Sequence, residues 1–430
     1  MIKERKNQMN KTLKMALASA SAFAVSAAAF AGAPVVRQGS VTMTQPKAQR
    51  VVINYAIDEE PAIVTVDIRT NGVSIGGANL WNMAGDVNKV VGVGSHTVTW
   101  APDKSWEGMR IPSGVTAVVT AWATNTPPDY MVVSLTAQNT RRFYANEESI
   151  PFGVTNDLYK TEYLVMRKIP AKNVEWRMGS PSTETDRTEA REVPHLVTLS
   201  DDYYIGVYEV TQRQYELIRG SRASCQYTNA FYYATRPVEK LSYEGLRGKP
   251  TDGFDWPNNG HAVISSGFIG RLRNHSGIDS FDLPTEAQWE FACRAGCGDA
   301  LYSGKAYSDA SVQEIARINS NGGRPDGVNP DRNCTTEYGT NKVGSYEKNA
   351  WGLYDIVGNV AEWCLDWWQE SPVGYDSERG PETGSRRVMR GGCWYYGVTR
   401  CRSAYRTSET PNNGDIDFGF RIACAVGVCE

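Results

Sequence analysis

The stretch RVMRGGCWYYGVTRCRSAYR runs from Arg387 to Arg406 and combines paired glycines, aromatic residues, arginines and two cysteines. Cys393 could be a reactive thiol, because the neighbouring Arg390 would favour its thiolate form. It could equally be half of a disulfide or a small buried hydrophobic residue. The stretch by itself leaves these interpretations open.

A second informative stretch, NAWGLYDIVGNVAEWCLDWW, lies just upstream and contains a tight turn. Asp355 and Glu362 flank the turn sequence IVGN. A tight turn exposes backbone carbonyls, and carboxylates at its ends can add further oxygen ligands, a combination that suits Ca²⁺. Alternatively, Asp355 and Asn359 satisfy backbone N–H groups of the turn.

Two helices are predicted in the same part of the chain. In EVTQRQYELI, Thr211 can cap the helix and Gln214 can complete a capping box. In LPTEAQWEFACRAG, Thr285 and Gln288 have the same spacing. The remainder of residues 174–424 consists of turn signals and short strand-like runs, which predicts one loop-rich unit.

Residues 41–137 have the pattern of an all-β module. Short runs such as RVVINYAI, AIVTVDIRT, GVTAVVTAW and YMVVSLT are separated by glycine, proline and Asn/Asp clusters. This pattern predicts an immunoglobulin-like or fibronectin-like β-sandwich with Trp100 and Trp122 in its core. Residues 138–173 are predicted to be a connector. Titratable residues do not cluster in the module, which favours a spacer or surface module without chemistry.

The N-terminus has the features of an export signal. A basic start precedes an alanine-rich apolar run, and Ala29-Phe30-Ala31 fits a cleavage site before Gly32. We therefore expect residues 1–31 to be a signal peptide and the protein to be periplasmic, extracellular or on the cell surface. A retained anchor is the alternative. After signal removal, no stretch is apolar enough to span a membrane.

Charge and composition exclude several functional classes. Residues 1–31 carry five basic residues and one acidic residue, so their removal takes the formal net charge from −3 to −7. An acidic protein is a poor candidate for nucleic-acid binding. The sequence contains no G-x-S-x-G elbow, no phosphate-binding loop and no GxGxxG motif. It also contains no C-x-x-C, and its four histidines are far apart, which argues against a local zinc site.

The order of the motifs resembles the sulfatase-modifying-factor family, whose best-known members are the formylglycine-generating enzymes. The resemblance covers residues 174–424 and is carried by WRMGSP, YEVTQRQYE, RPVEKLSY, DLPTEAQWEFACRAG, WGLYDIVGNVAEW, RVMRGGCW, CRSAYR and FGFRIA. It implies a loop-rich α+β fold of the C-type-lectin-like kind, preceded here by the all-β module.

The resemblance also implies metal sites. Family members bind calcium through a turn that corresponds to Asp355, Gly358, Val360 and Glu362. A second family calcium site would match Asn319 and Ser320, but its remaining ligands fall near 336–338, where loop lengths differ. We therefore expect Ca²⁺ at the first site and assign the second only weakly.

The sequence departs from the family at the catalytic position. Formylglycine-generating enzymes oxidise a substrate cysteine with O₂ and copper, using two cysteines spaced C-x4-C after a GGS-aromatic motif. Alignment on Gly391-Gly392 puts Tyr396 at the first copper position, so the C-x4-C pair is absent there. Cys393 replaces the family's serine, and Ala361 replaces its tryptophan. Copper is therefore not expected, since paired thiolates are what suits Cu(I).

The resemblance further suggests a disulfide. All nine cysteines lie between Cys225 and Cys429, and most should be paired in an exported protein. In the family, a cysteine at the position of Cys293 bridges to the strand that enters the A-x-R motif, at the position of Ser403. Cys401 lies two residues earlier and faces the same side of a strand. We predict a Cys293–Cys401 disulfide, with Cys297 and Cys393 as rival partners of Cys401.

Three functional hypotheses follow from these observations. The first is a binding protein whose pocket, lined by Arg390, Trp394, Tyr395, Tyr396 and Arg406, recognises a peptide, protein or glycan ligand. The second is an oxidase that modifies cysteine residues of exported proteins. The third is a structural surface protein. Because aromatic and arginine residues outnumber competent nucleophiles here, we favour the binding protein, with Cys393 as the candidate catalytic residue if the second holds.

Overall fold

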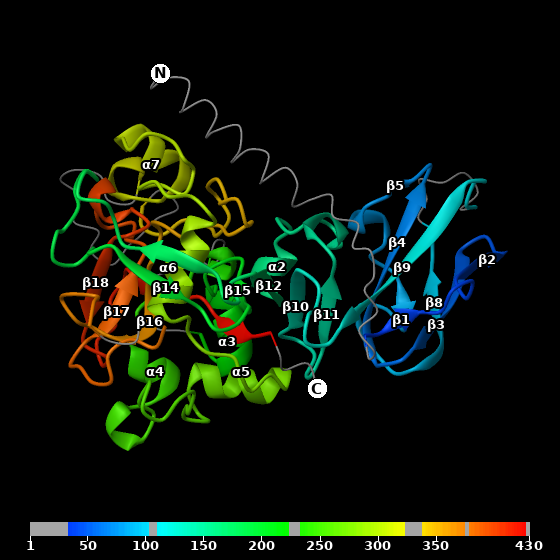
Figure 1. The fold of residues 1–430 in the computed structure, drawn as a ribbon, viewed down its shortest axis with the longest axis horizontal. Coiled ribbons are helices and arrows are strands. Elements are labelled where there is room, and N and C mark those ends of the chain that lie inside the picture. Colours follow the sequence, from blue (N-terminus) through cyan, green and yellow to red (C-terminus); the bar gives the residue numbers. More distant parts are fainter. Residues whose placement is uncertain (1–32, 103–109, 223–232, 323–337, 375–377, 427–430) are drawn as a thin grey trace.

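The computed structural model describes residues 33–102, 110–222, 233–322, 338–374 and 378–426. The predicted signal peptide, residues 1–31, lies outside the described residues. An all-β N-terminal region is followed by a larger domain of mixed α and β content (Figure 1). Within the described ranges, no helix has the length and apolar character that crossing a bilayer requires.

The N-terminal region contains two antiparallel sheets. One has the strand order β1-β3-β8-β6, with β2 also paired to β3, and the other joins β5, β7 and β9 to β4. The strands of the first sheet are β1 (Val35–Val36), β2 (Thr42–Lys47), β3 (Arg50–Asp58), β6 (Ala84–Gly85) and β8 (Gly94–Trp100). Those of the second are β4 (Ala62–Thr70), β5 (Val73–Ser74), β7 (Lys89–Val91) and β9 (Val115–Ala123).

Side chains from both sheets share one apolar core. Trp100 lies in this core, almost fully buried, and its indole N–H donates to the carbonyl of Asn79 at 2.9 Å. Its predicted role as a core anchor is confirmed. Trp122 differs from the prediction, because it packs against the core of the following domain and donates to the Thr65 hydroxyl at 2.9 Å. The immunoglobulin-like or fibronectin-like type of the region stays a prediction.

The central sheet of the second domain begins earlier than the sequence indicated. Its strand order is β11-β10-β12-β15-β20. The strands are β10 (Tyr130–Ser134), β11 (Arg141–Tyr144), β12 (Tyr163–Ile169), β15 (Tyr203–Gly206) and β20 (Ala423–Ala425). The run YMVVSLT therefore supplies a strand of this sheet rather than of the N-terminal region, and residues 138–173 supply strands rather than a connector. Every residue of β10 is buried, as in a central strand covered on both faces.

The rest of the domain consists of a hairpin, a second sheet and short helices. The hairpin pairs β13 (Glu175–Met178) with β14 (His195–Thr198), and the second sheet has the order β18-β17-β16-β19. The strands of this sheet are β16 (Ala361–Trp367), β17 (Arg387–Arg390), β18 (Arg406–Glu409) and β19 (Phe418–Gly419). The α-helices are α2 (Leu158–Thr161), α3 (Gln212–Arg219), α4 (Tyr243–Arg247), α5 (Phe268–Ser276), α6 (Glu286–Arg294) and α7 (Asp309–Ile315). The 3-10 helices include η1 (Gly77–Asn79), η3 (Glu147–Ser149), η4 (Tyr233–Thr235), η5 (Pro250–Asp252), η6 (Asn319–Asn321) and η7 (Val398–Arg400).

Both predicted capping boxes are confirmed. The Thr211 hydroxyl accepts from the Gln214 N–H at the start of α3, and the Gln214 side chain accepts from the Thr211 N–H. Thr285 and Gln288 make the same reciprocal pair at the start of α6. Such pairs satisfy two N–H groups that a helix terminus otherwise leaves without partners.

The N-terminal region and the second domain are in direct contact. The Phe143 N–H of β11 donates to the carbonyl of Asn88 at 2.9 Å. Ile63 belongs to the same buried apolar cluster as Met131 and Phe143, and Trp122 packs against that cluster. A hydrogen bond and shared apolar packing therefore join the two parts along β11.

Candidate functional site

The segment after β17 begins with a tight two-glycine turn. Gly391 and Gly392 have φ angles of 92° and 71°, in the region that favours glycine. A Cβ atom on Gly392 would lie 2.7 Å from the carbonyl oxygen of Arg400, so a side chain would not fit there. The turn directs Cys393 into the interior, where it is 1% exposed.

The Cys393 thiol is held in its neutral form. Its Sγ donates to Oδ2 of Asp417 at 3.0 Å. Burial and the adjacent carboxyl raise the pKa of Cys393 well above its ordinary value, and burial raises the pKa of Asp417 to about 6. Arg390 does not serve this thiol, because its guanidinium donates to Glu290 and to the carbonyl oxygens of 403–405. This geometry favours a structural role for Cys393 over a reactive one.

The predicted Cys293–Cys401 disulfide is not formed. The thiol of Cys293 faces Ser403, the position to which the family resemblance assigns its partner. The Sγ of Cys401 instead packs against Gly392 and the N–H of Gly358. The shift of two residues along the segment therefore leaves the two sulfurs in different places. Five of the described cysteines are free thiols, namely Cys293, Cys297, Cys364, Cys393 and Cys401.

The residues predicted to line a ligand pocket divide into two groups. Trp394 is fully buried and donates to the carbonyl of Ile416 at 3.1 Å. Arg390 and Arg406 are also buried, each in an ion pair with a glutamate of α6. These three side chains lie in the domain interior, where they make hydrogen bonds and ion pairs with other residues of the chain.

Tyr395 and Tyr396 are half-buried and reach the surface. Their rings are nearly perpendicular, at 82°, with centroids 5.2 Å apart. Arg400, which the sequence analysis did not select, lies 3.4 Å from the centroid of the Tyr396 ring. The Arg400 guanidinium reaches the Tyr396 ring because the chain turns through η7. Residue spacing in the sequence does not reveal this turn. We call Tyr395, Tyr396 and Arg400 the aromatic surface.

The weaker calcium assignment lies beside this aromatic surface. The N–H of Asn319 donates to the carbonyl of Tyr396 at 3.1 Å, and the Ser320 hydroxyl accepts from Gln313 at 3.3 Å. The other expected ligands, near 336–338, lie largely outside the described residues. The second site therefore stays a prediction.

The stronger calcium assignment centres on the IVGN turn. Asp355 has a φ of 51° and Gly358 a φ of 80°, so the turn is tight, as predicted. Oδ2 of Asp355 accepts the Gly344 N–H at 2.5 Å, whereas Oδ1 is buried without a hydrogen-bond partner. Burial raises the pKa of Asp355 to about 6. A buried carboxylate oxygen without a partner is the feature that a bound cation would satisfy.

Glu362 differs from the other predicted calcium ligands. Its two oxygens accept from the Arg421 guanidinium at 2.7 Å, and Oε2 also accepts from the Trp289 indole at 2.7 Å. With both oxygens engaged by Arg421, its carboxylate is poorly placed to be a metal ligand.

Glu209 is the residue that sequence reasoning missed. It is fully buried, and its carboxylate accepts from the Val360 N–H at 3.1 Å and the Asn359 amide at 2.6 Å. Burial and the nearby Asp355 and Glu362 charges raise its pKa well above the ordinary value. An acidic residue inside the otherwise apolar run Val207–Val210 was the available signal, because glutamate is rarely buried without a function or partner.

The donor set fits Ca²⁺ in part. Asp355 and Glu209 supply carboxylates, and the turn supplies carbonyl groups at Gly358 and Val360. Over the described parts of the chain, no group of three or more His, Cys, Asp and Glu side chains is arranged to hold a metal ion. Main-chain oxygens would therefore have to complete the coordination.

The fold and these turns define a domain of the formylglycine-generating-enzyme type. Residues 168–426 match the family model described as "Sulfatase-modifying factor enzyme 1-like domain", and the chain belongs to this family.

Two curated relatives share less than half of their length with this chain. The formylglycine-generating enzyme of Thermomonospora curvata is 38% identical over 150 residues, which is 33% of this chain and 48% of that protein. Serine/threonine-protein kinase pkn1 of Chlamydia pneumoniae is 35% identical over 285 residues, 61% of this chain and 39% of that protein. Among solved structures, Treponema denticola variable protein 1 aligns with 27% identity and a TM-score of 0.45, covering 61% of this chain and 95% of that chain. The chain therefore spans less than half the length of these curated relatives.

Proposed function

We propose that this chain is a binding protein of the family and not a copper-dependent oxidase. The proposal rests on the residues that stand where the family has its copper-binding cysteines. Tyr396 stands where the first copper cysteine is expected, and the only thiol in the two-glycine turn, Cys393, is neutral, buried and bonded to Asp417. The Cys401 thiol lies nearby, but burial raises the pKa of Cys401 to about 12 and that of Cys393 well above its ordinary value. Cu(I) prefers paired soft thiolates, and protonated thiols are poor substitutes.

The aromatic surface is the proposed recognition element. Two tyrosine rings and a guanidinium present large, planar groups that lose little conformational entropy when a partner binds. Such residues commonly dominate the energy of protein and glycan recognition. The ligand class is a peptide, protein or glycan that can stack on Tyr396 and accept hydrogen bonds from Arg400.

Peptide and glycan arrays probed with the labelled full chain test this proposal. We expect a reproducible ligand whose dissociation constant rises at least about tenfold in Tyr396→Ala. Trp81→Ala is the matched control, because Trp81 is an exposed aromatic residue of the N-terminal region. Equal affinity in wild type and Tyr396→Ala, or loss only in the control, would refute the aromatic surface as the binding element.

The oxidase alternative has a direct chemical test. The purified protein is incubated with copper, O₂ and a peptide that carries the sulfatase-type cysteine, and the peptide mass is measured. We expect the cysteine to be unchanged. An aldehyde product that disappears in Cys393→Ser would establish the oxidase and overturn the binding proposal.

A calcium ion at the IVGN turn is a second part of the proposal. Asp355 and Glu209 would bind the cation together with the carbonyl groups of Gly358 and Val360. The ion would supply the positive charge that these buried carboxylates require, and would thereby hold the turn that precedes β16. Its role here is structural, and copper has no proposed site.

Export of the protein is the remaining part. The basic and alanine-rich residues 1–31 support secretion with cleavage before Gly32. N-terminal sequencing of the protein recovered from the periplasm or medium of its host tests this. A chain that retains Met1, or that stays in the cytoplasmic fraction, would contradict it.

A further inference from the structure

One arginine in the stretch 386–406 differs from the others in how its charge is paired. Five arginines of this stretch form ion pairs with carboxylates, namely Arg386 with Glu409, Arg387 with Asp255, Arg390 with Glu290, Arg402 with Glu192 and Arg406 with Glu286. Arg400, which is half-buried, forms no ion pair with any residue that the structure describes. Its positive charge is therefore left for a partner at the aromatic surface.

Two acidic residues of the neighbouring segment 414–418 do not neutralise this charge. The Asp417 carboxyl accepts from the Cys393 thiol at 3.0 Å, and burial raises the pKa of Asp417 to about 6 despite the charge of Arg400. The Asp415 carboxylate accepts the N–H of Ile416 at 2.7 Å. Both carboxyl groups are thus engaged with their own segment or with the interior.

The guanidinium of Arg400 is held in place by an aromatic ring. It lies 3.4 Å from the centroid of the Tyr396 ring, which is a stacking distance. Stacking leaves the N–H groups at the edge of the guanidinium, where they can donate two parallel hydrogen bonds to a carboxylate. Because the ring already restricts the side chain, less conformational entropy is lost when a carboxylate binds.

Apolar side chains continue the aromatic surface. The Tyr395 ring lies 5.5 Å from that of the buried Trp394, and Ile416 packs against the same tryptophan. Tyr395 and Ile416 are both half-buried, so part of each side chain is accessible. Accessible aromatic and apolar groups beside a charged group are typical of surfaces that bind proteins and peptides. A glycan has no apolar side chain to cover Ile416, so a peptide matches this surface better.

We propose that the aromatic surface binds an acidic peptide segment of a partner protein. A glutamate or aspartate carboxylate of the peptide binds Arg400, and an apolar side chain next to it covers Tyr395 and Ile416. This inference rests on the proposed binding function, whose ligand class it narrows to acidic peptides. Arg400 distinguishes charged from neutral ligands, whereas Tyr396 holds the guanidinium and adds contact area.

A peptide array probed with the labelled full chain tests the proposal. The array carries heptapeptides with glutamate, glutamine or lysine at the centre and varied apolar residues on either side, and fluorescence anisotropy gives the affinities of the best binders. We expect the best glutamate peptide to bind at least about tenfold more tightly than its glutamine and lysine counterparts. Arg400→Gln removes the charge but keeps an amide donor, and should reduce this preference to within about twofold.

Two controls accompany the array. Arg177→Gln makes the same change at an exposed arginine of β13, a strand that supplies no residue of the aromatic surface, and should leave the preference unchanged. Thermal melting verifies that both variants fold. N-acetylglutamate amide should bind at least about tenfold more weakly than the best peptide, since it lacks the apolar neighbours. Equal binding of this small molecule would show that a peptide is not required.

The possible failures are distinguishable. Equal binding of the glutamate and glutamine peptides, or equal effects of Arg400→Gln and Arg177→Gln, would overturn the acidic-peptide proposal. If neutral peptides or glycans bound in a manner that Tyr396→Ala abolishes, the aromatic surface would stand and only the acidic ligand class would fail. Absence of any ligand that depends on Tyr396 would refute both proposals.

Discussion

Two clusters of buried charge in the second domain differ in how completely their charges are paired. Around residues 402–406, Glu184, Glu192 and Glu286 each form an ion pair with a guanidinium. Around the IVGN turn, Glu209, Asp355 and Glu362 lie near one arginine, Arg421, which is bound to Glu362. The first arrangement is complete by itself, whereas the second has negative charge left over.

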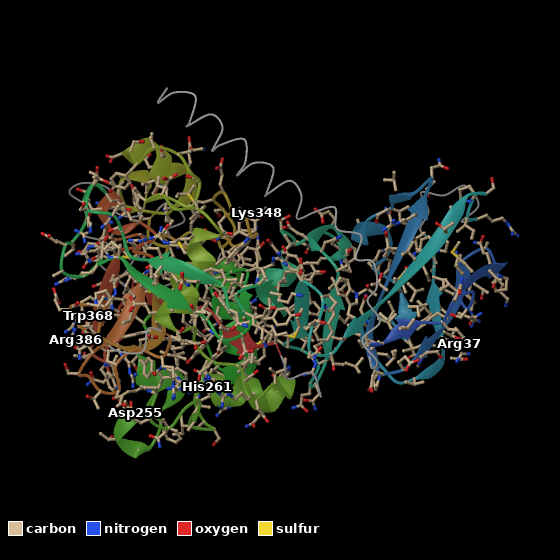
Figure 2. All side chains as sticks on the ribbon, viewed as in Figure 1. Arg37, Asp255, His261, Lys348, Trp368 and Arg386 are labelled. Atoms are coloured by element: carbon tan, nitrogen blue, oxygen red, sulfur yellow. The ribbon has the colours of Figure 1, made fainter. Side chains whose placement is uncertain are left out.

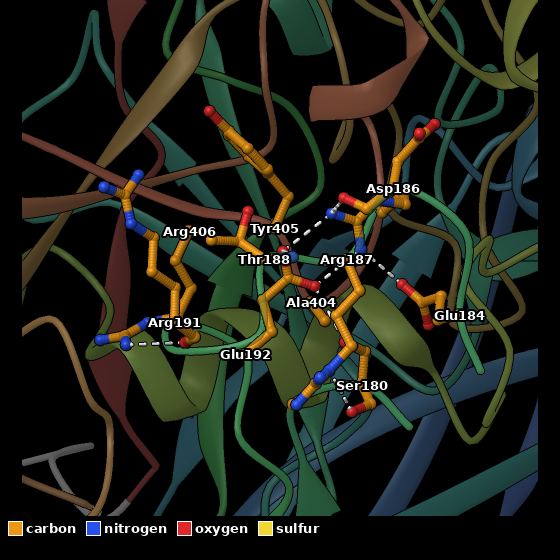
Figure 3. A network of polar contacts seen from close by, with 12 residues as sticks. Ser180, Glu184, Asp186, Arg187, Thr188, Arg191, Glu192, Ala404, Tyr405 and Arg406 are labelled. Carbon is orange, nitrogen blue, oxygen red and sulfur yellow. Dashed lines mark hydrogen bonds and ion pairs between the residues drawn. The ribbon is translucent and has the colours of Figure 1, made fainter. Parts of the chain in front are cut away.

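The paired cluster is held by bidentate contacts. Arg402 donates to both oxygens of Glu192 at 2.7 and 2.8 Å and to Glu184 at 2.6 Å, and Figure 3 shows both glutamates within this network. Arg406 donates to both oxygens of Glu286 at 2.5 and 2.7 Å. Burial opposes the ionisation of Glu192, but the hydrogen bonds and charge of Arg402, together with hydrogen bonds from Thr188 and Ser180, outweigh burial and lower its pKa.

The edge of the paired cluster reaches the surface at Trp368, which lies beside Arg386 (Figure 2). The guanidinium of Arg406 lies 4.8 Å from the centroid of the Trp368 ring. The aromatic ring thus covers a guanidinium whose hydrogen bonds are already used, which keeps water away from the ion pair.

The comparison teaches that arginine content alone does not mark a binding site. An arginine that is buried and bidentate belongs to the fold, because separating it from its partner would leave an unpaired charge in the interior. Buried carboxylates without a guanidinium partner are unusual. The pKa values of Asp355 and Glu209 are raised, because burial disfavours their charged forms. The unpaired carboxylates therefore make the IVGN turn the candidate cation site.

The strongest test of the comparison removes an arginine from the paired cluster. Arg402→Ala should lower the free energy of unfolding by about 3–5 kcal/mol, because Glu184 and Glu192 would remain buried without their partner. Urea denaturation measures this. Lys172→Ala, which removes an exposed pair with Asp201, should change stability by less than about 1 kcal/mol. Similar effects of the two substitutions would show that the cluster does not stabilise the fold.

The second test concerns Asp366, a carboxyl group at the margin of the paired cluster. Burial and the Glu286 charge raise its pKa from 3.8 to about 7, although it accepts the Glu286 N–H at 2.7 Å. A raised folded-state pKa favours the folded protein below pH 3.8, and this contribution is lost as the pH rises through about 7.

We therefore expect the contribution of Asp366 to the free energy of unfolding to fall by about 3 kcal/mol between about pH 4 and about pH 7. This is slightly less than the whole pKa shift implies, because the interval does not cover the entire titration. Asp366→Asn keeps the acceptor and should flatten this part of the profile. Urea unfolding at several pH values compares the two proteins. Parallel profiles would contradict the assignment.

The third test adds the missing cation to the unpaired cluster. Calcium binding to the folded state should raise stability by RT ln(1 + [L]/Kd), about 2.7 kcal/mol at a hundredfold excess over Kd. Thermal melting in calcium and then in chelator measures the shift. Asp355→Asn should abolish it, whereas Asp366→Asn should retain it. Equal midpoints for wild type in calcium and chelator would rule out the site.

The smallest expected effect is at Cys293 and Cys401, which are free thiols in this structure. Alkylation of the unfolded, unreduced protein followed by peptide mass mapping should recover Cys293 and Cys401 as modified thiols. A Cys293–Cys401 linked peptide would show that the helix and the turn approach more closely than this structure has them. It would restore the pairing that the family resemblance suggested.

The sequence by itself determined the local elements and the family. Thr211 and Thr285 start helices because a capping box needs residues only three positions apart. The strands of the N-terminal region follow from alternating apolar residues between turn signals. The order of motifs over residues 174–424 identified the family, whose model matches residues 168–426. All of these depend on neighbours along the chain.

Only the tertiary structure decided which side chains face a ligand and which face each other. Arg390, Trp394 and Arg406 belong to the interior, whereas Tyr396 reaches the surface, although all have residue types common in binding sites. Glu209 meets the IVGN turn because the segment between β15 and α3 lies against it, a contact that no local spacing encodes. Which side chains contact one another depends on how segments distant in sequence pack together. Residue type and the spacing of apolar residues therefore predicted the helices and strands but not the contacts between them.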